Sequence, residues 1–229
     1  MKDPLLPTED GKEQFVKQMF DNISGNYDTV NRIMTFRIDQ LWRKQALKQL
    51  RLRPESLILD LACGTGDFIK LAKTQGYRCI GTDFSMGMLQ HSKLSSNLVC
   101  SDGLNLAFAD NCFDGATCGF ALRNFRELPT VFAELNRVLK PGGRISLLEV
   151  GSPSSPLLRI GHQIYFNKVV PLIGRVLSDA EAYRYLPASV KYLPSPQTLK
   201  QMLNDAGFTE IGHSQLLTGA AQLITATKA

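Results

Sequence analysis

The order of apolar and polar positions changes character at about residue 54 of this chain. Upstream, apolar side chains recur every three or four residues, which is the period of a helix. They are Phe15, Met19, Ile23 and Tyr27, followed by Leu41, Ala46, Leu47 and Leu50. Downstream, short apolar runs alternate with helix-compatible stretches. The pattern predicts helices over residues 12–50 and alternating strands and helices after them.

The apolar runs in the middle of the chain have the length of strands. Short runs bounded by turn residues are typical of buried parallel strands. The runs cover 57–62, 78–84, 97–101, 115–122 and 144–150, and helix-compatible stretches cover 68–73, 86–93 and 128–139. Alternation at this interval predicts βαβ units around a parallel sheet.

The C-terminal end has a different pattern. Residues 197–206 predict a helix that ends at Gly207, and two strand-like runs, 210–217 and 221–227, are joined by a tight link. Such a link predicts an antiparallel hairpin. The expected fold is therefore α/β, with a mostly parallel seven-stranded sheet, an antiparallel C-terminal hairpin and helices on both faces. Residues 151–196 form a proline-rich insertion, whose helical face Pro171 must bend or break.

Composition fits one globular domain. The 229 residues are 44% hydrophobic and 21% charged, which excludes a disordered chain or a coiled coil. The net charge of +5 permits an anionic partner without requiring one. The five cysteines form no Cys-x-x-Cys pair, so neither a disulfide framework nor a zinc knuckle is expected, and most should be buried. No signal-peptide core or membrane-spanning run is visible, so a cytoplasmic location is expected.

A glycine-rich turn, Asp60-Leu-Ala-Cys-Gly64-Thr65-Gly66-Asp67, follows the first strand-like run. Glycine lets the backbone approach a ligand without a Cβ in the way. The dinucleotide fingerprint needs a third glycine where this chain has Ile69, and Asp67 is a poor neighbour for a pyrophosphate. Asp60 suits a cationic ligand instead. S-adenosylmethionine, which has a sulfonium, an ammonium and no phosphate, is the expected ligand.

Two further carboxylates end the next strand-like runs. Asp83 lies about 20 residues after Asp60, where a carboxylate can accept both ribose hydroxyls. Asp102 ends the third run and suits the amino edge of adenine. Capping of a helix is the alternative role for any single one of these aspartates, but it does not explain why all of them lie at strand ends. The expected cofactor-binding residues are Asp60, Gly64, Thr65, Gly66, Asp83, Asp102, Gly103 and Gly119.

These motifs resemble class I S-adenosylmethionine-dependent methyltransferases, which have a Rossmann-like fold. Other segments resemble the C-methyltransferase family of ubiquinone and menaquinone biosynthesis, over roughly residues 12–228. The segments are Tyr27-Asp-Thr-Val-Asn31 with Trp42, Phe113-Asp114, Leu122-Arg-Asn124, Arg137 to Glu149, and Tyr183-Arg-Tyr-Leu-Pro187. Three positions depart from the family pattern: Val30 replaces Met, Thr35 replaces Ser and Asp39 replaces His. The last change exchanges one proton acceptor for another, so the resemblance assigns no catalytic role there.

The resemblance implies methylation of a ring carbon of a prenylated quinol. Demethylmenaquinol is the leading substrate, and a benzoquinol precursor of ubiquinone or another small molecule is the alternative. The ring becomes nucleophilic when a hydroxyl loses its proton or is strongly hydrogen-bonded. Arg123 is expected to stabilise the phenolate and Asn124 to orient a hydroxyl. The alternative for Arg123 is an ion pair with a carboxylate such as Glu127.

The proton acceptor stays open between several residues. Tyr27, which completes the expected catalytic set with Arg123 and Asn124, is one candidate. Asp28 and His162 are others. His91 and His213 are expected to lie away from the site. No metal-ligand spacing is present, so no metal is expected.

The insertion is expected to hold the prenyl tail, with core packing as the alternative. Residues 121–200 contain 11 Lys or Arg and 5 Asp or Glu, a net charge of +6. A basic and apolar insertion predicts peripheral contact with an anionic membrane at its inner face. The apolar candidates are Leu157, Leu158, Ile160, Ile164, Tyr165, Phe166, Val169 and Val170.

The whole chain, 1–229, is expected to be one methyltransferase domain. It divides into a helical N-terminal cap (1–53), a cofactor-binding core (54–150), a substrate-side insertion (151–196), and a C-terminal helix with its hairpin (197–229).

Three other classes of protein fit less well. Amino-methylating nucleic-acid enzymes have an Asn/Asp-Pro-Pro-aromatic segment where this chain has Phe120-Ala-Leu-Arg-Asn124, and no basic tract with exposed aromatics is present, so no nucleic acid is expected. Ile69 disfavours a nicotinamide enzyme. A cofactor-binding scaffold without activity would bind the donor and turn nothing over. An Arg123→Ala variant that loses activity but still binds the donor would favour the enzyme.

Overall fold

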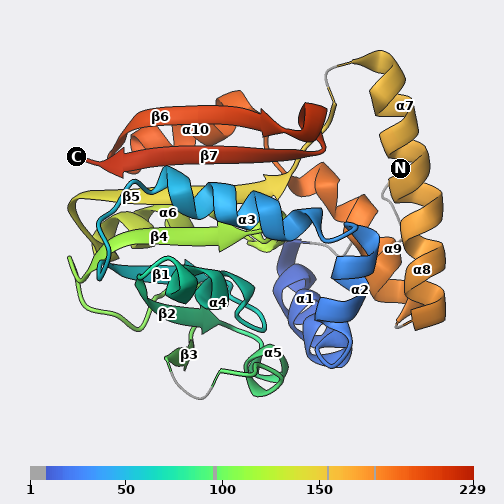
Figure 1. Cartoon of the computed structure of the whole chain (residues 1–229), viewed down its shortest axis with the longest axis horizontal. Helices are drawn as coiled ribbons and strands as arrows, with labels where there is room; N and C mark the ends of the chain where they lie inside the picture. The colour runs from blue at the N-terminus through green and yellow to red at the C-terminus, as the bar shows by residue number, and fades with distance from the viewer. Residues whose placement is uncertain (1–8, 95–96, 154, 178) are drawn as a thin grey trace.

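The computed structural model describes residues 9–94, 97–153, 155–177 and 179–229 (Figure 1). Its centre is a seven-stranded sheet with the order β3-β2-β1-β4-β5-β7-β6. The strands are β1 Leu57–Leu61, β2 Arg78–Asp83, β3 Leu98–Cys100, β4 Phe113–Gly119, β5 Leu139–Val150, β6 Phe208–Leu216 and β7 Ala221–Lys228. Strands β1 to β5 pair in parallel, and β7 lies antiparallel between β5 and β6. The predicted sheet and its C-terminal hairpin are confirmed.

Helices cover both faces of this sheet because side chains alternate along each strand. The helices concerned are α3 Ile38–Gln49, α4 Asp67–Thr74, α5 Met86–Gln90, α6 Leu128–Val138 and α10 Pro196–Asp205. Leu59 and Leu61 of β1 pack with α6 and α10. Ile58, on the opposite side of the same strand, packs with α3 and α4. Burying each of these side chains stabilises the fold by roughly 1.5–3 kcal/mol.

The N-terminal cap consists of α1 Glu9–Ile23, α2 Tyr27–Met34 and α3. In Figure 1, α1 and α2 lie beyond the ends of β1 and β4, at the edge of the sheet where the parallel strands finish. Two successive residues in the left-handed region, Phe36 (φ 51°) and Arg37 (φ 62°), separate α2 from α3. The cap packs its apolar side against the insertion, where Val16 and Ile23 share a buried cluster with Tyr183.

The insertion forms the second wall at this edge. It contains α7 Pro156–Ile164, a π-helical turn η2 Tyr165–Val169, α8 Val170–Leu177, α9 Ala180–Ser189 and a short turn η3 Val190–Tyr192. The segments α7, η2 and α8 follow one another without a gap, so Pro171 does not break the helix; the π-helical turn η2 comes directly before it, where the proline lacks an N–H for the regular helical hydrogen bond. The Tyr165 hydroxyl donates to the Met34 carbonyl at 2.5 Å, which joins η2 to the cap.

The cysteines are free and differ in their exposure to solvent. Cys63, Cys79 and Cys118 are buried, Cys112 is partly buried and Cys100 is exposed, so most cysteines are buried as predicted. Among the described residues, no helix is both long enough and apolar enough to cross a bilayer.

Candidate active site

A cavity opens at the carboxyl ends of β1, β2 and β4. The cap closes one side of it with Phe20 and Tyr27. Of the expected cofactor-binding residues, the wall includes Gly64, Asp83, Asp102, Gly103 and Gly119. Asp60, Thr65 and Gly66 are not part of the wall.

Asp83 and Gly64 are hydrogen-bonded to each other in the wall of this cavity. The Asp83 carboxylate accepts hydrogen bonds from the N–H groups of Gly64 (2.8 Å) and Ser85 (2.9 Å). Gly64 has a φ of 55°, and a Cβ there would meet nothing within 4 Å, so the backbone faces open space. Burial raises the pKa of Asp83 to about 6, although the two N–H donors oppose the change. At neutral pH this carboxylate is mostly ionised and can accept ligand hydroxyls.

Asp60 belongs to β1 and comes directly before Leu61 and Ala62, which line the cavity. Its Oδ1 accepts from the Thr117 hydroxyl at 3.0 Å, whereas its Oδ2 is enclosed and has no hydrogen-bond partner among the described residues. Burial raises the pKa of Asp60 to about 7, against the opposing charge of Arg43. A buried carboxylate with an unsatisfied oxygen is costly unless a cation compensates it. The residues therefore fit a ligand with a positively charged group.

The other turn residues have structural partners. The Thr65 hydroxyl donates to Asp28 of α2 at 2.5 Å, and Gly66 (φ 88°) starts α4 in the left-handed region. A Cβ on Gly103 would lie 2.6 Å from the Phe125 ring, so only glycine fits there. The Asp102 carboxylate accepts from the Leu104 N–H at 3.0 Å and still lines the cavity.

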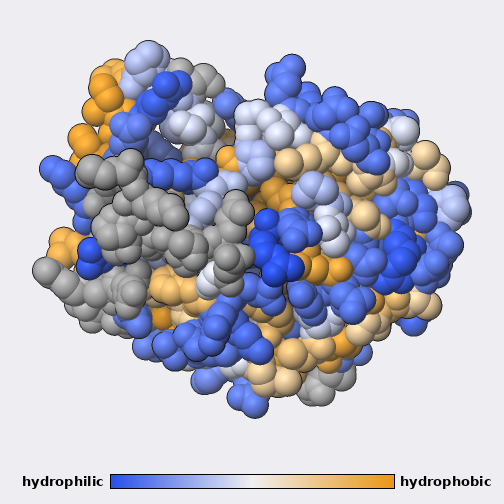
Figure 2. All heavy atoms as spheres, turned by 180° about the vertical axis from the view of Figure 1, so that it is seen from behind, coloured by the Kyte–Doolittle hydropathy of each residue, from blue (hydrophilic) through white to orange (hydrophobic). Residues whose placement is uncertain are grey.

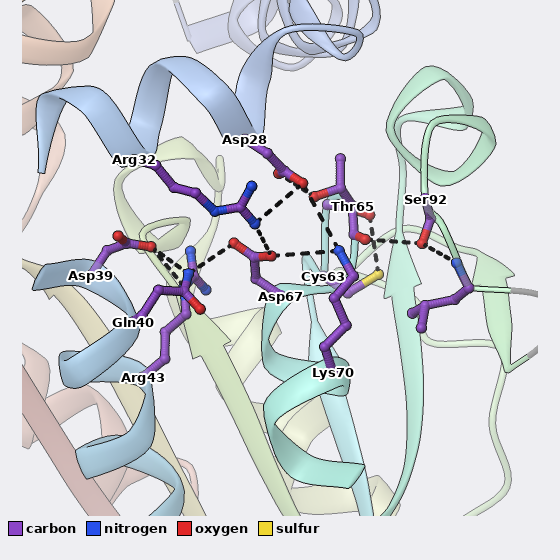
Figure 3. Close-up of polar contacts among 12 residues, drawn as sticks. Asp28, Arg32, Asp39, Gln40, Arg43, Cys63, Thr65, Asp67, Lys70 and Ser92 are labelled. Atoms are coloured by element: carbon purple, nitrogen blue, oxygen red, sulfur yellow. Dashed lines mark hydrogen bonds and ion pairs between the residues drawn. The ribbon is translucent and has the colours of Figure 1, made fainter. Parts of the chain in front are cut away.

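A charged network fastens the cap to the glycine-rich turn (Figure 3). The Arg32 guanidinium of α2 lies 3.1 Å from the Asp67 carboxylate at the start of α4, and Lys70 lies 3.6 Å from the same carboxylate. Gln40 of α3 donates to Asp67 at 3.2 Å. Three helices therefore meet at one carboxylate, which holds Tyr27 of α2 over the cavity.

A second cavity adjoins the first and shares Tyr27 and Phe120 with it. Most of its wall is apolar and comes from α2, α3, α7 and η2. The charged or titratable side chains on this wall are Tyr27, Asp39, Arg43, Arg123, His162 and Tyr165. Arg43 was not among the site residues predicted from the sequence. The sequence feature that could have indicated Arg43 is the charge pair Asp39 and Arg43, which shares a helical face with the apolar residues of α3.

Arg123 and Asn124 lie in a short 3-10 turn after β4, η1 Leu122–Asn124, and face different cavities. Arg123 lines the second cavity, and its guanidinium is paired with the buried Glu149 of β5 and donates to the Phe120 carbonyl (2.8 Å). The alternative of an ion pair is thus found, but with Glu149 and not Glu127. Asn124 lines the first cavity and its amide oxygen accepts from the Tyr185 hydroxyl at 3.3 Å.

The histidines occupy three separate environments. His162 lines the second cavity and its ring lies 4.5 Å from that of Phe166; burial lowers the pKa of His162 and so favours the neutral imidazole. His91 is exposed and hydrogen-bonded to Ser24, and His213 is bonded to Gln222 in the C-terminal hairpin. The described residues contain no group of three or more side chains suited to hold a metal ion.

Comparisons with known proteins extend over almost the whole chain. Residues 8–228 match the model of the ubiE/COQ5 methyltransferase family. A demethylmenaquinone methyltransferase from Roseiflexus castenholzii is 38% identical, over 100% of this chain and 99% of the relative. One from Corynebacterium kroppenstedtii is 39% identical, over 96% of this chain and 97% of the relative.

Solved structures share the fold at lower sequence identity. A possible histamine N-methyltransferase from Thermotoga maritima has a TM-score of 0.67 at 21% identity, covering 93% of this chain and 99% of that one. A Haemonchus contortus phosphoethanolamine N-methyltransferase 2 bound to S-adenosylmethionine has a TM-score of 0.59 at 15% identity, and the match covers 82% of this chain and 52% of that one. The predicted fold of class I S-adenosylmethionine-dependent methyltransferases is confirmed, and this chain belongs to the ubiE/COQ5 methyltransferase family.

Proposed function

We propose that this chain transfers a methyl group from S-adenosylmethionine to a ring carbon of demethylmenaquinol, which gives menaquinol. The observation that carries the proposal is the pair of adjoining cavities. One is edged by carboxylates and the other is mostly apolar, and they meet at Tyr27 and Phe120. The names of the relatives support the choice of acceptor.

The first cavity is the proposed site of the methyl donor, which supplies an already activated methyl group. In this proposal Asp83 accepts the ribose hydroxyls, Asp102 binds the amino edge of adenine, and the unsatisfied oxygen of Asp60 favours the cationic end. The backbone of the remaining expected residues shapes the cavity or the turn behind it. These residues are Gly64, Thr65, Gly66, Gly103 and Gly119.

The second cavity is the proposed site of the quinol. A reduced ring is electron-rich and can attack a methyl group held in line with it, whereas an oxidised quinone cannot. Because Glu149 already balances the charge of Arg123, we assign that guanidinium the role of a fixed hydrogen-bond donor to one quinol oxygen. Asn124 orients the ring from the cofactor side, and Tyr27 closes the boundary between the two cavities.

Methyl transfer to reduced and oxidised acceptor tests this proposal. The purified chain is supplied with methyl-labelled S-adenosylmethionine and demethylmenaquinone, either reduced by dithionite or left oxidised. We expect label in the naphthoquinol ring methyl with the reduced acceptor and none with the oxidised one. Binding of S-adenosylhomocysteine without any turnover of the reduced acceptor would contradict the proposal.

We also propose that α7 and α8 contact an anionic membrane that carries the quinol. Large apolar side chains are exposed there, including Leu157 (79%) and Ile160 (56%). Figure 2 shows apolar surface gathered at the end of the molecule that carries α7. This surface adjoins the second cavity, whose wall includes His162 of α7 and Phe166 of η2. The net charge of +6 over residues 121–200 favours anionic lipid.

Liposome flotation at low salt tests the membrane contact. We expect stronger binding to anionic than to neutral vesicles, and several-fold weaker binding when Leu157 and Ile160 are both replaced by Ser. Leu41→Ser is the matched control, because Leu41 is exposed to a similar degree (63%) but lies on α3. Equal binding to both vesicle types, or an equal effect of the control, would contradict membrane contact through α7.

A further inference from the structure

The second cavity contains two arginines, but their charges are balanced to different degrees. The charge of the Arg123 guanidinium is balanced by Glu149, and the group also donates to the Phe120 carbonyl and to the Ser189 hydroxyl (3.2 Å from Nε). Arg43 also lines the cavity, and its Nε is enclosed without a hydrogen-bond partner in the described part of the chain. Arg43 therefore retains a donor that a ligand oxygen could accept.

Arg43 lies at the junction of the two cavities. Its guanidinium carbon is 5.0 Å from the centre of the Phe68 ring and 5.3 Å from that of Phe120. One of its terminal nitrogens lies only 2.9 Å from the place of a Cβ on Gly119, which lines the cofactor cavity at the end of β4. Aromatic rings on two sides hold the guanidinium in place without neutralising it.

Asp39 supplies the carboxylate next to this arginine (Figure 3). The two residues lie one turn apart on α3, and Arg43 Nε is 3.6 Å from Asp39 Oδ2, beyond hydrogen-bond distance. The Asp39 side chain is buried, lines the second cavity, and accepts from the Thr35 hydroxyl (2.7 Å) and the Gln40 amide (2.8 Å). Each oxygen keeps a lone pair, since a carboxylate has about four acceptor positions.

A buried charge pair without a hydrogen bond between its two members costs free energy of folding. Because the other residues of this wall are mostly apolar, apolar side chains at these two positions of α3 would avoid that cost. A quinol hydroxyl placed between the two groups would donate a hydrogen bond to Asp39 and accept one from Arg43, so both side chains would gain a hydrogen-bond partner. The pair thus has the donor and the acceptor that activation of a hydroxyl requires.

We propose that Asp39 and Arg43 are the catalytic pair that activates the quinol, Asp39 as proton acceptor and Arg43 as the donor that stabilises the phenolate. This rests on the proposed function. The hydroxyl O–H bond breaks and its proton passes to Asp39. The ring carbon then forms a bond to the methyl group, and the C–S electron pair stays on sulfur. Finally the ring carbon releases its hydrogen to water as a proton, and Asp39 returns its proton to the oxygen.

His162 is the competing proton acceptor on this wall. Its Nε2 is enclosed without a partner among the described residues, and its ring packs on Phe166. His162 belongs to α7, on the outer wall, whereas Arg43 reaches Gly119 at the boundary with the cofactor cavity. Proton acceptor and phenolate donor must act on one oxygen near the methyl group. The Asp39–Arg43 pair meets this requirement on a single helix.

Kinetics of Asp39→Asn and Arg43→Met test the proposal. We expect kcat for demethylmenaquinol to fall by about 10²-fold or more in each, in line with the usual contributions of a general base or an oxyanion donor. The affinity for S-adenosylhomocysteine should stay within about threefold. The rate of Asp39→Asn should also rise by about tenfold per pH unit toward the pKa of a phenol, about 10, because the substrate then ionises unaided. A residue with a merely structural role would not change the pH profile in this way.

Asp114→Asn is the matched control. It removes a carboxylate that accepts from the Leu57 N–H (2.8 Å) and Lys140 (2.7 Å) at the opposite edge of the sheet, and kcat should stay within about threefold. A kcat for Asp39→Asn within tenfold of the parent, or a pH profile parallel to the parent's, overturns the proposal. If Asp39→Asn does not fold, Arg43→Lys decides: a kcat at least tenfold lower with intact S-adenosylhomocysteine binding supports it, and an unchanged kcat refutes it. A parent chain that turns over no demethylmenaquinol refutes the proposed function instead.

Discussion

Replacing Asp60 by Asn tests whether this buried carboxylate destabilises the unligated protein and contributes to binding of the proposed methyl donor. Asp60 is 1% exposed, one of its oxygens has no partner among the described residues, and burial raises its pKa from 3.8 to about 7. Between these two pH values the folded chain binds a proton that the unfolded chain has released. The free energy of unfolding of the unligated protein therefore falls as the pH rises from about 4 to 7.

The size of the effect follows from the same values. The difference of about three pKa units between 3.8 and 7 corresponds to about 4 kcal/mol lost above pH 7. Asn removes the charge and can keep the bond from Thr117, but it buries an unpaired amide donor, which costs about 1–3 kcal/mol. We therefore expect unligated Asp60→Asn to be more stable than the parent by about 1–3 kcal/mol at pH 8. At about 2–4 °C per kcal/mol, Tm should rise by roughly 2–12 °C.

Scanning calorimetry of the unligated parent and variant at pH 8 and pH 5 provides the assay. The gain should disappear at pH 5, where Asp60 is protonated in the parent, and the variant should bind S-adenosylmethionine at least tenfold more weakly at pH 8. Asp114→Asn is a control of opposite sign: although partial burial opposes ionisation, bonds from Lys140 and the Leu57 N–H hold the pKa of Asp114 below 3.8, so its loss should lower Tm at pH 8. An Asp60→Asn variant that is no more stable than the parent at pH 8, or that differs equally at both pH values, would refute the reasoning.

Three further predictions concern the same two cavities. Asp83→Asn should weaken binding of S-adenosylmethionine by about 10–100-fold in titration calorimetry, because hydrogen bonds to a charged group contribute about 1.5–3 kcal/mol; unchanged affinity would remove Asp83 from the ribose site. Affinity of the parent for S-adenosylmethionine should fall from pH 8 to pH 5, since Asp60 and Asp83, with pKa values of about 7 and 6, take up protons and lose the negative charges that favour the cationic end and the ribose hydroxyls; a flat profile would contradict this. Arg123→Met should lower the free energy of unfolding by about 3–5 kcal/mol by leaving Glu149 buried and unpaired, and denaturant unfolding of the double variant Arg123→Met/Glu149→Leu should recover most of that loss.

The order of apolar and polar residues was sufficient to predict the sheet, because a strand that is buried on both faces consists almost entirely of apolar residues. The run from Leu57 to Leu61 packs on two different helix layers, and no polar side chain except Asp60 interrupts it. Boundaries were harder to predict. The fifth strand was expected at 144–150 and begins at Leu139, because Leu139 pairs with Phe113. An apolar residue between a helix and a turn does not show which element contains it.

The place of Asp83 and Asp102 in one cavity could be predicted because parallel strands end at one edge of a sheet, whatever surrounds them. The same rule extends to Glu149 near the end of β5, which was not among the site residues predicted from the sequence. Arg43 is a different case. Its place depends on how α3 crosses the sheet, and no sequence spacing reports how closely it approaches Gly119 and Phe120.

The proposed reaction is methylation of a naphthoquinol ring. The most direct test is a competition in which equal amounts of reduced demethylmenaquinone and a reduced benzoquinone precursor, with matched prenyl tails, share one pool of methyl-labelled S-adenosylmethionine. We expect the label to appear predominantly in menaquinol. Preferential labelling of the benzoquinol, or labelling of neither ring by a chain that binds S-adenosylhomocysteine, would contradict it.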